Sequence, residues 1–318
     1  MIEQFKKDID NGLSSSPKTL PSMYFYDKIG DALFVKIMHS EEYYLTRAEL
    51  DIFQNQTQQM IDQLQLDKSQ HFELIELGAG DGLKTKELLK VLSQEQFSFD
   101  YLPVDISQNA LDQLEKSINE ELPKVSIKTQ QGDYFKVLET LNQSKTPKVV
   151  LFLGSNLGNM SDEMATKFIS KLSQNLSEND KLYLGVDLIK PAKIVKPAYN
   201  DSEGYTRDFN MNLLRRINNE LGANFDLDQF SHQPEYDETE GIAKSFIRSE
   251  QEQEVKIEAL DKSFHFEEGE KIATEISRKY NDEIVEKVIK NADFKISSKL
   301  TDRNNYFANY ILNRTKKQ

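Results

Sequence analysis

The sequence predicts an α/β fold, in which helices cover both faces of a mainly parallel sheet, together with a second, smaller α+β domain. Three observations support this prediction. The chain has 318 residues, which is enough for about two domains. Between residues 72 and 190, short apolar runs alternate with amphipathic stretches, and after residue 190 this alternation stops.

The apolar runs are rich in β-branched residues and nearly continuous, which is typical of strands that are buried on both faces of a parallel sheet. With amphipathic stretches between them, they give the βαβ rhythm of a doubly wound sheet, whose ligand binds at the carboxyl ends of the strands. The predicted strands cover 72–77, 100–106, 124–129, 148–155 and 181–189, and the predicted helices cover 84–97, 108–121 and 162–177.

The remaining segments show other patterns. The first 65 residues are helical in pattern, as are 204–222 and 278–292, whereas 241–266 alternates as antiparallel strands do and the chain closes with two further strands. We therefore expect one domain from 1–65 and 190–285, which binds the substrate, and another from 66–189 and 286–318, which forms the main sheet.

The composition limits the types of reaction mechanism and of partner that we expect. The chain has no cysteine, and its four histidines stand far apart, so a metal or thiolate mechanism is not expected. A net charge of −13, with basic residues spread among acids, predicts neither a nucleic-acid nor a membrane partner but a small molecule. No apolar run has the length of a signal peptide or a membrane span, so we expect a cytoplasmic protein.

A glycine-rich turn follows the first predicted strand. Gly78, Gly80 and Gly82 alternate between this strand and the next helix, where they let the backbone approach a ligand closely. The spacing is G-x-G-x-G and not the pyrophosphate-binding G-x-G-x-x-G, and the acidic Glu76 just before it favours a cationic or phosphate-free adenosine ligand. A tight turn without a ligand is the simpler alternative.

The next two strand ends also carry residues that suit an adenosine ligand. Asp105 ends the second strand, where a carboxylate accepts hydrogen bonds from ribose hydroxyls; alone, it would serve equally as a cap of the following helix. Asp133 and Tyr134 follow the third strand, where an adenine ring and its amino group would be held. Together these strand ends favour a methyltransferase that depends on S-adenosylmethionine (SAM).

Motifs along nearly the whole chain carry a resemblance to a known family. They are YFYD at 24–27, EYYLTR at 42–47, LGSNLGN at 153–159, AYND at 198–201 and TEIS at 274–277. With them the chain resembles the ergothioneine-pathway histidine Nα-methyltransferase family. The resemblance implies a Rossmann-like SAM-binding domain, a second domain for the substrate, and three methyl transfers to the α-amino group of L-histidine, giving hercynine.

The resemblance also implies roles for single residues. Tyr43 and Asn159 would meet the amino-acid backbone and are the residues expected next to the reacting amine. The other substrate residues are Tyr199, Glu275 and Ser277. The residues expected at SAM are Tyr26, Gly78, Gly80, Lys84, Asp105, Asp133 and Tyr134.

The residues themselves support part of this assignment. Glu275 and Ser277 stand two apart, so on an extended segment both side chains point to one face and are able to hold the two nitrogens of an imidazole. The alternative is that Thr274 and Ser277 cap the helix 278–292. At 242–244 the family has Ile-Glu-Met, whereas this chain has Ala243 and Lys244, which bears on the side-chain half of the pocket.

Three other functions stay open. A nicotinamide-dependent dehydrogenase would need the pyrophosphate-binding glycine spacing. A SAM-binding protein without activity would not need Asn159, Tyr199 and Glu275 together. A relative that methylates another amino acid or amine is the nearest alternative. The sequence does not fix the oligomeric state, and a monomer is compatible with it.

Overall fold

The computed structural model describes residues 2–132, 134–141 and 145–315, and within it the chain divides into two compact units. Unit 1 comprises Met1–Tyr44 and Lys190–Ser277, and unit 2 comprises Leu45–Ile189 and Arg278–Gln318. The sequence predicts the first division at residue 65; in the structure it falls after Tyr44, because the two helices that follow pack into the core of unit 2. The last division falls after Ser277 and not at residue 285.

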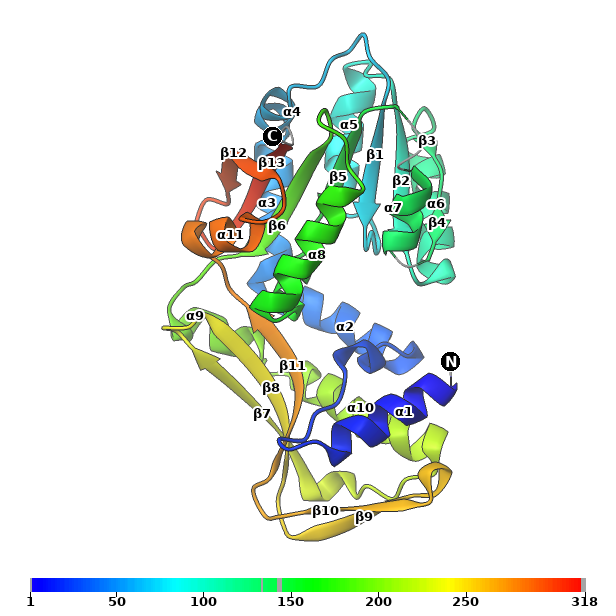
Figure 1. Cartoon of the computed structure of the whole chain (residues 1–318), viewed down its shortest axis with the longest axis vertical. Helices are drawn as coiled ribbons and strands as arrows, with labels where there is room; N and C mark the ends of the chain where they lie inside the picture. Colours follow the sequence, from blue (N-terminus) through cyan, green and yellow to red (C-terminus); the bar gives the residue numbers. More distant parts are fainter. Residues whose placement is uncertain (1, 133, 142–144, 316–318) are drawn as a thin grey trace. The chain divides into compact units, whose positions relative to one another are not determined.

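The sheet of unit 2 is parallel except at one edge (Figure 1). The strand order is β12-β13-β6-β5-β1-β2-β3, with β4 also paired to β2. The strands are β1 (Phe72–Leu77), β2 (Phe99–Asp105), β3 (Ser126–Ile127), β4 (Gln130–Gln131), β5 (Lys148–Phe152), β6 (Lys181–Asp187), β12 (Phe294–Thr301) and β13 (Phe307–Arg314).

Helices cover both faces of this sheet. α7 (Tyr134–Leu141), α8 (Asp162–Gln174) and α11 (Asp282–Ile289) contribute to the core on one face. The core on the other face contains α3 (Tyr44–Asn55), α4 (Thr57–Leu64), α5 (Thr85–Gln94) and α6 (Gln108–Glu121). The predicted α/β fold with a doubly wound parallel sheet is therefore confirmed.

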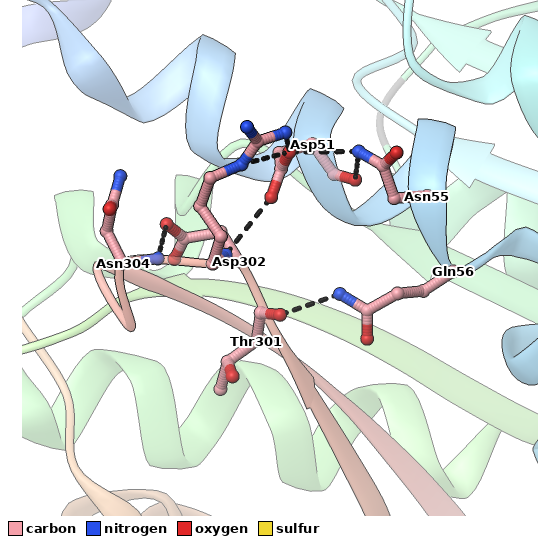
Figure 2. Close-up of polar contacts among 7 residues, drawn as sticks. Asp51, Asn55, Gln56, Thr301, Asp302 and Asn304 are labelled. Atoms are coloured by element: carbon pink, nitrogen blue, oxygen red, sulfur yellow. Dashed lines mark hydrogen bonds and ion pairs between the residues drawn. The ribbon is translucent and has the colours of Figure 1, made fainter.

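Helix α3 is tied to the antiparallel edge of the sheet by polar contacts with the β12–β13 turn (Figure 2). The Asp51 carboxylate accepts hydrogen bonds from Nε and the backbone N–H of Arg303, at 2.9 and 3.1 Å. The Gln56 amide donates to the carbonyl oxygen of Thr301 at 2.7 Å. These contacts hold the C-terminal part of α3, and a second acidic residue of the same helix lies deeper, as described below.

Unit 1 combines helices with antiparallel strands (Figure 1). β7 (Phe230–Asp237), β8 (Ile242–Ser249) and β11 (Lys271–Arg278) form a sheet of order β11-β8-β7, while β9 (Gln253–Ile257) and β10 (Lys262–Phe266) form a hairpin. The apolar core also contains side chains of α1 (Ile2–Ser14), α2 (Lys28–His39) and α10 (Tyr205–Leu221). Unit 1 also contains the short helices η1 (Ser22–Phe25), α9 (Ala192–Ala198), η3 (Leu227–Gln229) and η4 (Glu258–Leu260).

The structure corrects several local predictions. The TEIS segment lies inside strand β11, so Thr274 and Ser277 do not cap a helix, and α11 begins only at Asp282. The predicted strand 124–129 is reduced to the two-residue strand β3, and the predicted strand 148–155 ends at Phe152. No helix of the described residues is long and apolar enough to cross a membrane.

Candidate functional site

The glycine turn after β1 lies at the carboxyl edge of the sheet in unit 2. Gly78 has a φ of +75°, and a β-carbon there would stand 2.8 Å from the Tyr134 hydroxyl and 3.3 Å from Nδ2 of Asn156. Gly78 is therefore required both by its backbone conformation and by the close approach of two side chains. Tyr134 is the first residue of α7, and its ring packs edge-on against Phe152 and Phe168.

The same turn is joined to the end of β2. The Asp105 carboxylate accepts hydrogen bonds from the backbone N–H of Gly80 at 3.3 Å and from that of Ser107 at 2.9 Å. Around the β-carbon position of Gly80, no atom of the described chain lies within 4 Å apart from those of Gly80 and its two neighbours in sequence. Side chains therefore pack closely against the turn at Gly78, whereas the space over Gly80 is free. This arrangement suits a flat ligand that lies over the turn.

Two large apolar side chains are exposed at this edge, although the sequence patterns do not single them out. Ile106, which follows Asp105, is 71% exposed, and Leu83 of the glycine turn is 44% exposed. Exposed apolar side chains next to a carboxylate suit a ligand with an aromatic base and a sugar. Asp133, the other predicted contact of this ligand, lies outside the described residues.

Glu76 lies beneath the turn and not on its ligand side, which corrects the expectation that this acid faces a cationic ligand. Its carboxylate accepts hydrogen bonds from the hydroxyls of Thr85, at 2.8 Å, and Tyr101. Burial raises the pKa of Glu76 to about 7, against the two hydrogen bonds and the Lys84 ammonium, which favour the ionised form. Glu76 therefore supports the turn from within the core.

Lys84 follows the glycine turn, and its ammonium group forms an ion pair with Glu49 of α3. Glu49 is fully buried, and none of the sequence motifs points to it. The same carboxylate accepts a hydrogen bond from the backbone N–H of Gly154 at 2.8 Å, in the loop after β5. A carboxylate from a helix thus joins two loops at the carboxyl edge of the sheet.

The loop after β5 continues into the short helix η2 (Asn156–Asn159). Its start is fixed by Ser155, whose φ is +58° and whose hydroxyl accepts the backbone N–H of Asp187 at 3.0 Å. Asn159 ends η2 and is exposed, whereas Asn156 at its start lies next to Gly78. The structure therefore places Asn156 and not Asn159 against the glycine turn.

Unit 1 brings together three of the predicted substrate residues. Tyr199 follows α9, and its hydroxyl donates to Oγ of Ser277 at 2.7 Å. Glu275 lies on the same strand as Ser277, β11, and accepts a hydrogen bond from the Ser245 hydroxyl of the neighbouring strand β8 at 3.4 Å. Ser245 is fully buried, and only its place in the strand pairing reveals its contact with Glu275.

The two other tyrosines of unit 1 belong to an aromatic group around Phe34. The ring of Tyr26 packs edge-on against Phe34 with 5.6 Å between centroids, and the ring of Tyr43 does so at 6.4 Å. Tyr26 is 45% exposed and Tyr43 is half-buried, so part of each ring remains exposed.

Strand β8 explains the two departures from the family pattern. Burial alternates along it, so that Ala243 and Ser245 point into the protein and Lys244 is exposed. Lys244 pairs across the ladder with Glu235 of β7. The pKa of Glu235 is lowered mainly by its hydrogen bond from Lys271 and to a lesser extent by the charge of Lys244. The Lys244 ammonium therefore lies on the face opposite to Ser245 and the Glu275 contact.

Comparison with known proteins decides the family. Residues 5–314 match the family described as histidine-specific, SAM-dependent methyltransferases. The chain belongs to this family. It is 34% identical to the histidine N-alpha-methyltransferase of Mycolicibacterium smegmatis, over 89% of this chain and 86% of that protein.

Two further relatives are similar over most of the chain. The histidine N-alpha-methyltransferase of Mycobacterium tuberculosis is 33% identical, over 88% of this chain and 85% of the relative. Ergothioneine biosynthesis protein 1 of Schizosaccharomyces pombe is 28% identical, over 92% of this chain but only 38% of its own length. The match therefore spans both units of the methyltransferase.

The carboxyl edge of unit 2 fits the SAM that this family uses. The space over Gly80 is open, the Asp105 carboxylate lies beside it, and Ile106 and Leu83 expose apolar surface at the same edge, which are the features that a ribose and an adenine ring would require. SAM supplies the methyl group of the reaction. Among the described residues, no group of three or more histidine, aspartate or glutamate side chains is placed to hold a metal ion.

Proposed function

We propose that this methyltransferase transfers three methyl groups in succession from SAM to the α-amino nitrogen of L-histidine and so forms hercynine. The observation that carries the choice of histidine is the pair of polar side chains on β11. Glu275 and Ser277 stand two residues apart on one strand, and both are held by hydrogen bonds within unit 1. A carboxylate and a hydroxyl on one strand face match the two nitrogens of an imidazole.

The reaction requires mainly that the amine is unprotonated and that its nitrogen is aligned with the methyl group of SAM. Each transfer is a displacement at the methyl carbon, in which the amine nitrogen attacks and the sulfur leaves, so positive charge moves from sulfur to nitrogen. An α-amino group has a pKa of about 8, so a pocket that disfavours the ammonium form assists the first two transfers. Tyr43 and Asn159 stay our predicted contacts of the amino-acid backbone, and no general base is assigned.

The SAM assignment keeps Tyr26, Lys84 and Asp133 as proposed contacts, beside the residues of the glycine turn. Lys84 is bound to Glu49 in the structure, so any contact with SAM would be made by an ammonium group that is already paired. We further propose that the enzyme acts in the cytoplasm, where SAM is made, with no nucleic-acid or membrane partner.

A relative acting on another amino acid or amine is the second candidate, and Ala243 is the observation that favours it. Its small side chain is buried on the same face of β8 as Ser245, where the family has a glutamate. Lys244 no longer counts for this candidate, because it points to the other face of the strand.

Product mass spectra on a panel of amino acids and amines test the proposal. We expect histidine to give a trimethylated product, phenylalanine to be rejected by several orders of magnitude, and histamine, which lacks the carboxylate, to be much poorer than histidine. Comparable turnover of histamine and histidine would contradict recognition of the α-carboxylate. A panel in which another amino acid is preferred would favour the second candidate.

A further inference from the structure

We propose that Glu49 of α3 is a positioning residue of the SAM site, which acts through the Lys84 ammonium and the Gly154 backbone. This inference rests on the proposed SAM site at the carboxyl edge of unit 2. It concerns a residue that touches neither the proposed substrate nor the glycine turn itself.

The Glu49 carboxylate is surrounded by donors from three parts of the sheet edge. Oε2 accepts from the Lys84 ammonium and from the Gly154 N–H, and Oε1 accepts from the Asn309 amide of β13 at 3.0 Å. A carboxylate offers about four lone-pair sites, so most of its capacity is used. The Glu49 carboxylate is therefore held in one orientation.

A glycine in β6 leaves space for this carboxylate, although it weakens the strand. Gly185 lies in the middle of β6, and a β-carbon there would overlap Oε1 of Glu49 and stand 3.0 Å from the Asn309 amide. Glycine in a strand interior weakens the strand and marks a close approach. Here the approaching group is the Glu49 side chain, which has no exposed surface.

Between Glu49 and the glycine turn, two polar side chains lie close to glycine backbones. The Lys84 ammonium lies 3.6 Å from the β-carbon position of Gly154, and Oδ1 of Asn156 lies 3.7 Å from the same point. Nδ2 of Asn156 in turn lies 3.3 Å from the β-carbon position of Gly78. The Lys84 ammonium and the Asn156 amide therefore both lie beside Gly154, and the same amide lies beside Gly78, so we expect a shift of Lys84 or Gly154 to disturb the turn on which SAM is proposed to lie.

The Glu49–Lys84 pair also affects the charge at the SAM site. An unpaired lysine next to this edge would repel the positive sulfur of SAM, and the repulsion would be strong in a partly buried setting. The Lys84 side chain is only 19% exposed, so solvent screens its charge incompletely. Pairing with Glu49 neutralises it and leaves its remaining N–H donors able to meet the carboxylate of a ligand.

Binding of SAM and of its demethylated product, measured by calorimetry on the full chain, tests this inference without any amino-acid substrate. We expect Glu49→Gln to weaken binding of the demethylated product by about 10-fold or more, the loss of a hydrogen bond to a charged group. In a Lys84→Met background the same substitution should cost at least threefold less, because Glu49 acts largely through Lys84.

Asp51→Asn is the matched control. It removes a carboxylate two residues along the same helix, where Figure 2 shows it bound to the β12–β13 turn. We expect the affinity of this variant to stay within about twofold of the parent. A loss as large as that of Glu49→Gln would show that any disturbance of α3 weakens binding, and would overturn the inference.

Two further results would overturn it: unchanged binding in Glu49→Gln, or an equal loss in the presence and absence of Lys84. Should Glu49→Gln not fold, Glu49→Asp takes its place, because it keeps the charge but draws it back from Lys84; parental affinity in that variant would also overturn the inference. A parent that binds neither ligand would refute the proposed function itself, whereas a parent that binds both leaves that function standing whatever the variants do.

Discussion

Tyr199 and Ser277 are joined hydroxyl to hydroxyl at 2.7 Å, and both are buried in unit 1. Tyr199 is also held at its backbone, because Nε2 of His232 lies 2.9 Å from its carbonyl oxygen. A carbonyl oxygen only accepts, so Nε2 carries the proton and donates. Burial lowers the pKa of His232, which keeps the ring neutral, and the tyrosine is thus fixed at both ends.

We expect Tyr199→Phe to raise the KM for histidine by about 2- to 12-fold with a smaller change in kcat. The substitution keeps the ring but removes a hydrogen bond worth about 0.5–1.5 kcal/mol, so Ser277 is no longer held. Tyr24→Phe is the matched control, because the Tyr24 hydroxyl donates to Asp8 of the same unit, and neither residue is among the proposed substrate contacts. Steady-state kinetics that show the same KM in Tyr199→Phe and the parent would contradict the substrate role of Tyr199.

Glu275→Gln should lower kcat/KM for histidine by about 10- to 100-fold, because an amide accepts an imidazole N–H less strongly than a carboxylate does. Lys244→Met should change it by less than about twofold, since Lys244 is exposed on the opposite face of β8. Assays with histidine and with the best other substrate separate specificity from general damage. If Glu275→Gln leaves the preference for histidine unchanged, Glu275 does not read the ring.

The sheet was predictable because its strands are almost uniformly apolar. β1 and β5 are buried along nearly their whole length, so their sequences carry a strong signal even without neighbours. Strand β11, which holds Glu275 and Ser277, alternates in burial instead, and the sequence predicts no strand there. Segments whose pattern reflects burial on both faces were therefore placed well from the sequence.

Helices α3 and α4 show what the sequence does not settle. Their amphipathic pattern predicts an apolar face, but the pattern is silent on which core receives it, and they join unit 2 and not the first domain. For the same reason the roles of Glu49 and Ser245 could not be predicted. A buried polar residue is recognised by its partners, and Lys84 and Glu275 are distant from them in the chain.

Gly78→Ala should lower the melting temperature clearly more than Gly80→Ala. Both glycines have positive φ, +75° and +54°, so an alanine at either costs about 1–2 kcal/mol in the backbone. Only at Gly78 would the added methyl also meet another group, the Tyr134 hydroxyl at 2.8 Å, since the space around Gly80 is open in the described chain. Equal melting temperatures of the two variants, measured by circular dichroism, would contradict this close contact.

Glu76 should make the protein lose stability as the pH rises from about 4.5 to about 7. Its pKa in the folded state is raised to about 7 by burial, above the ordinary value of 4.5 for the unfolded chain. The neutral carboxyl is thus favoured in the folded state, so its contribution is complete below pH 4.5 and is lost as the pH passes the folded pKa. The loss amounts to at most about 3 kcal/mol, at 1.36 kcal/mol for each pKa unit.

Urea unfolding of the parent and of Glu76→Gln at several pH values isolates this contribution, because other groups titrate alike in both. The amide of the variant still meets the hydroxyls of Thr85 and Tyr101, so the variant should fold. A difference in unfolding free energy between the two proteins that stays constant across this range would show that Glu76 does not titrate there.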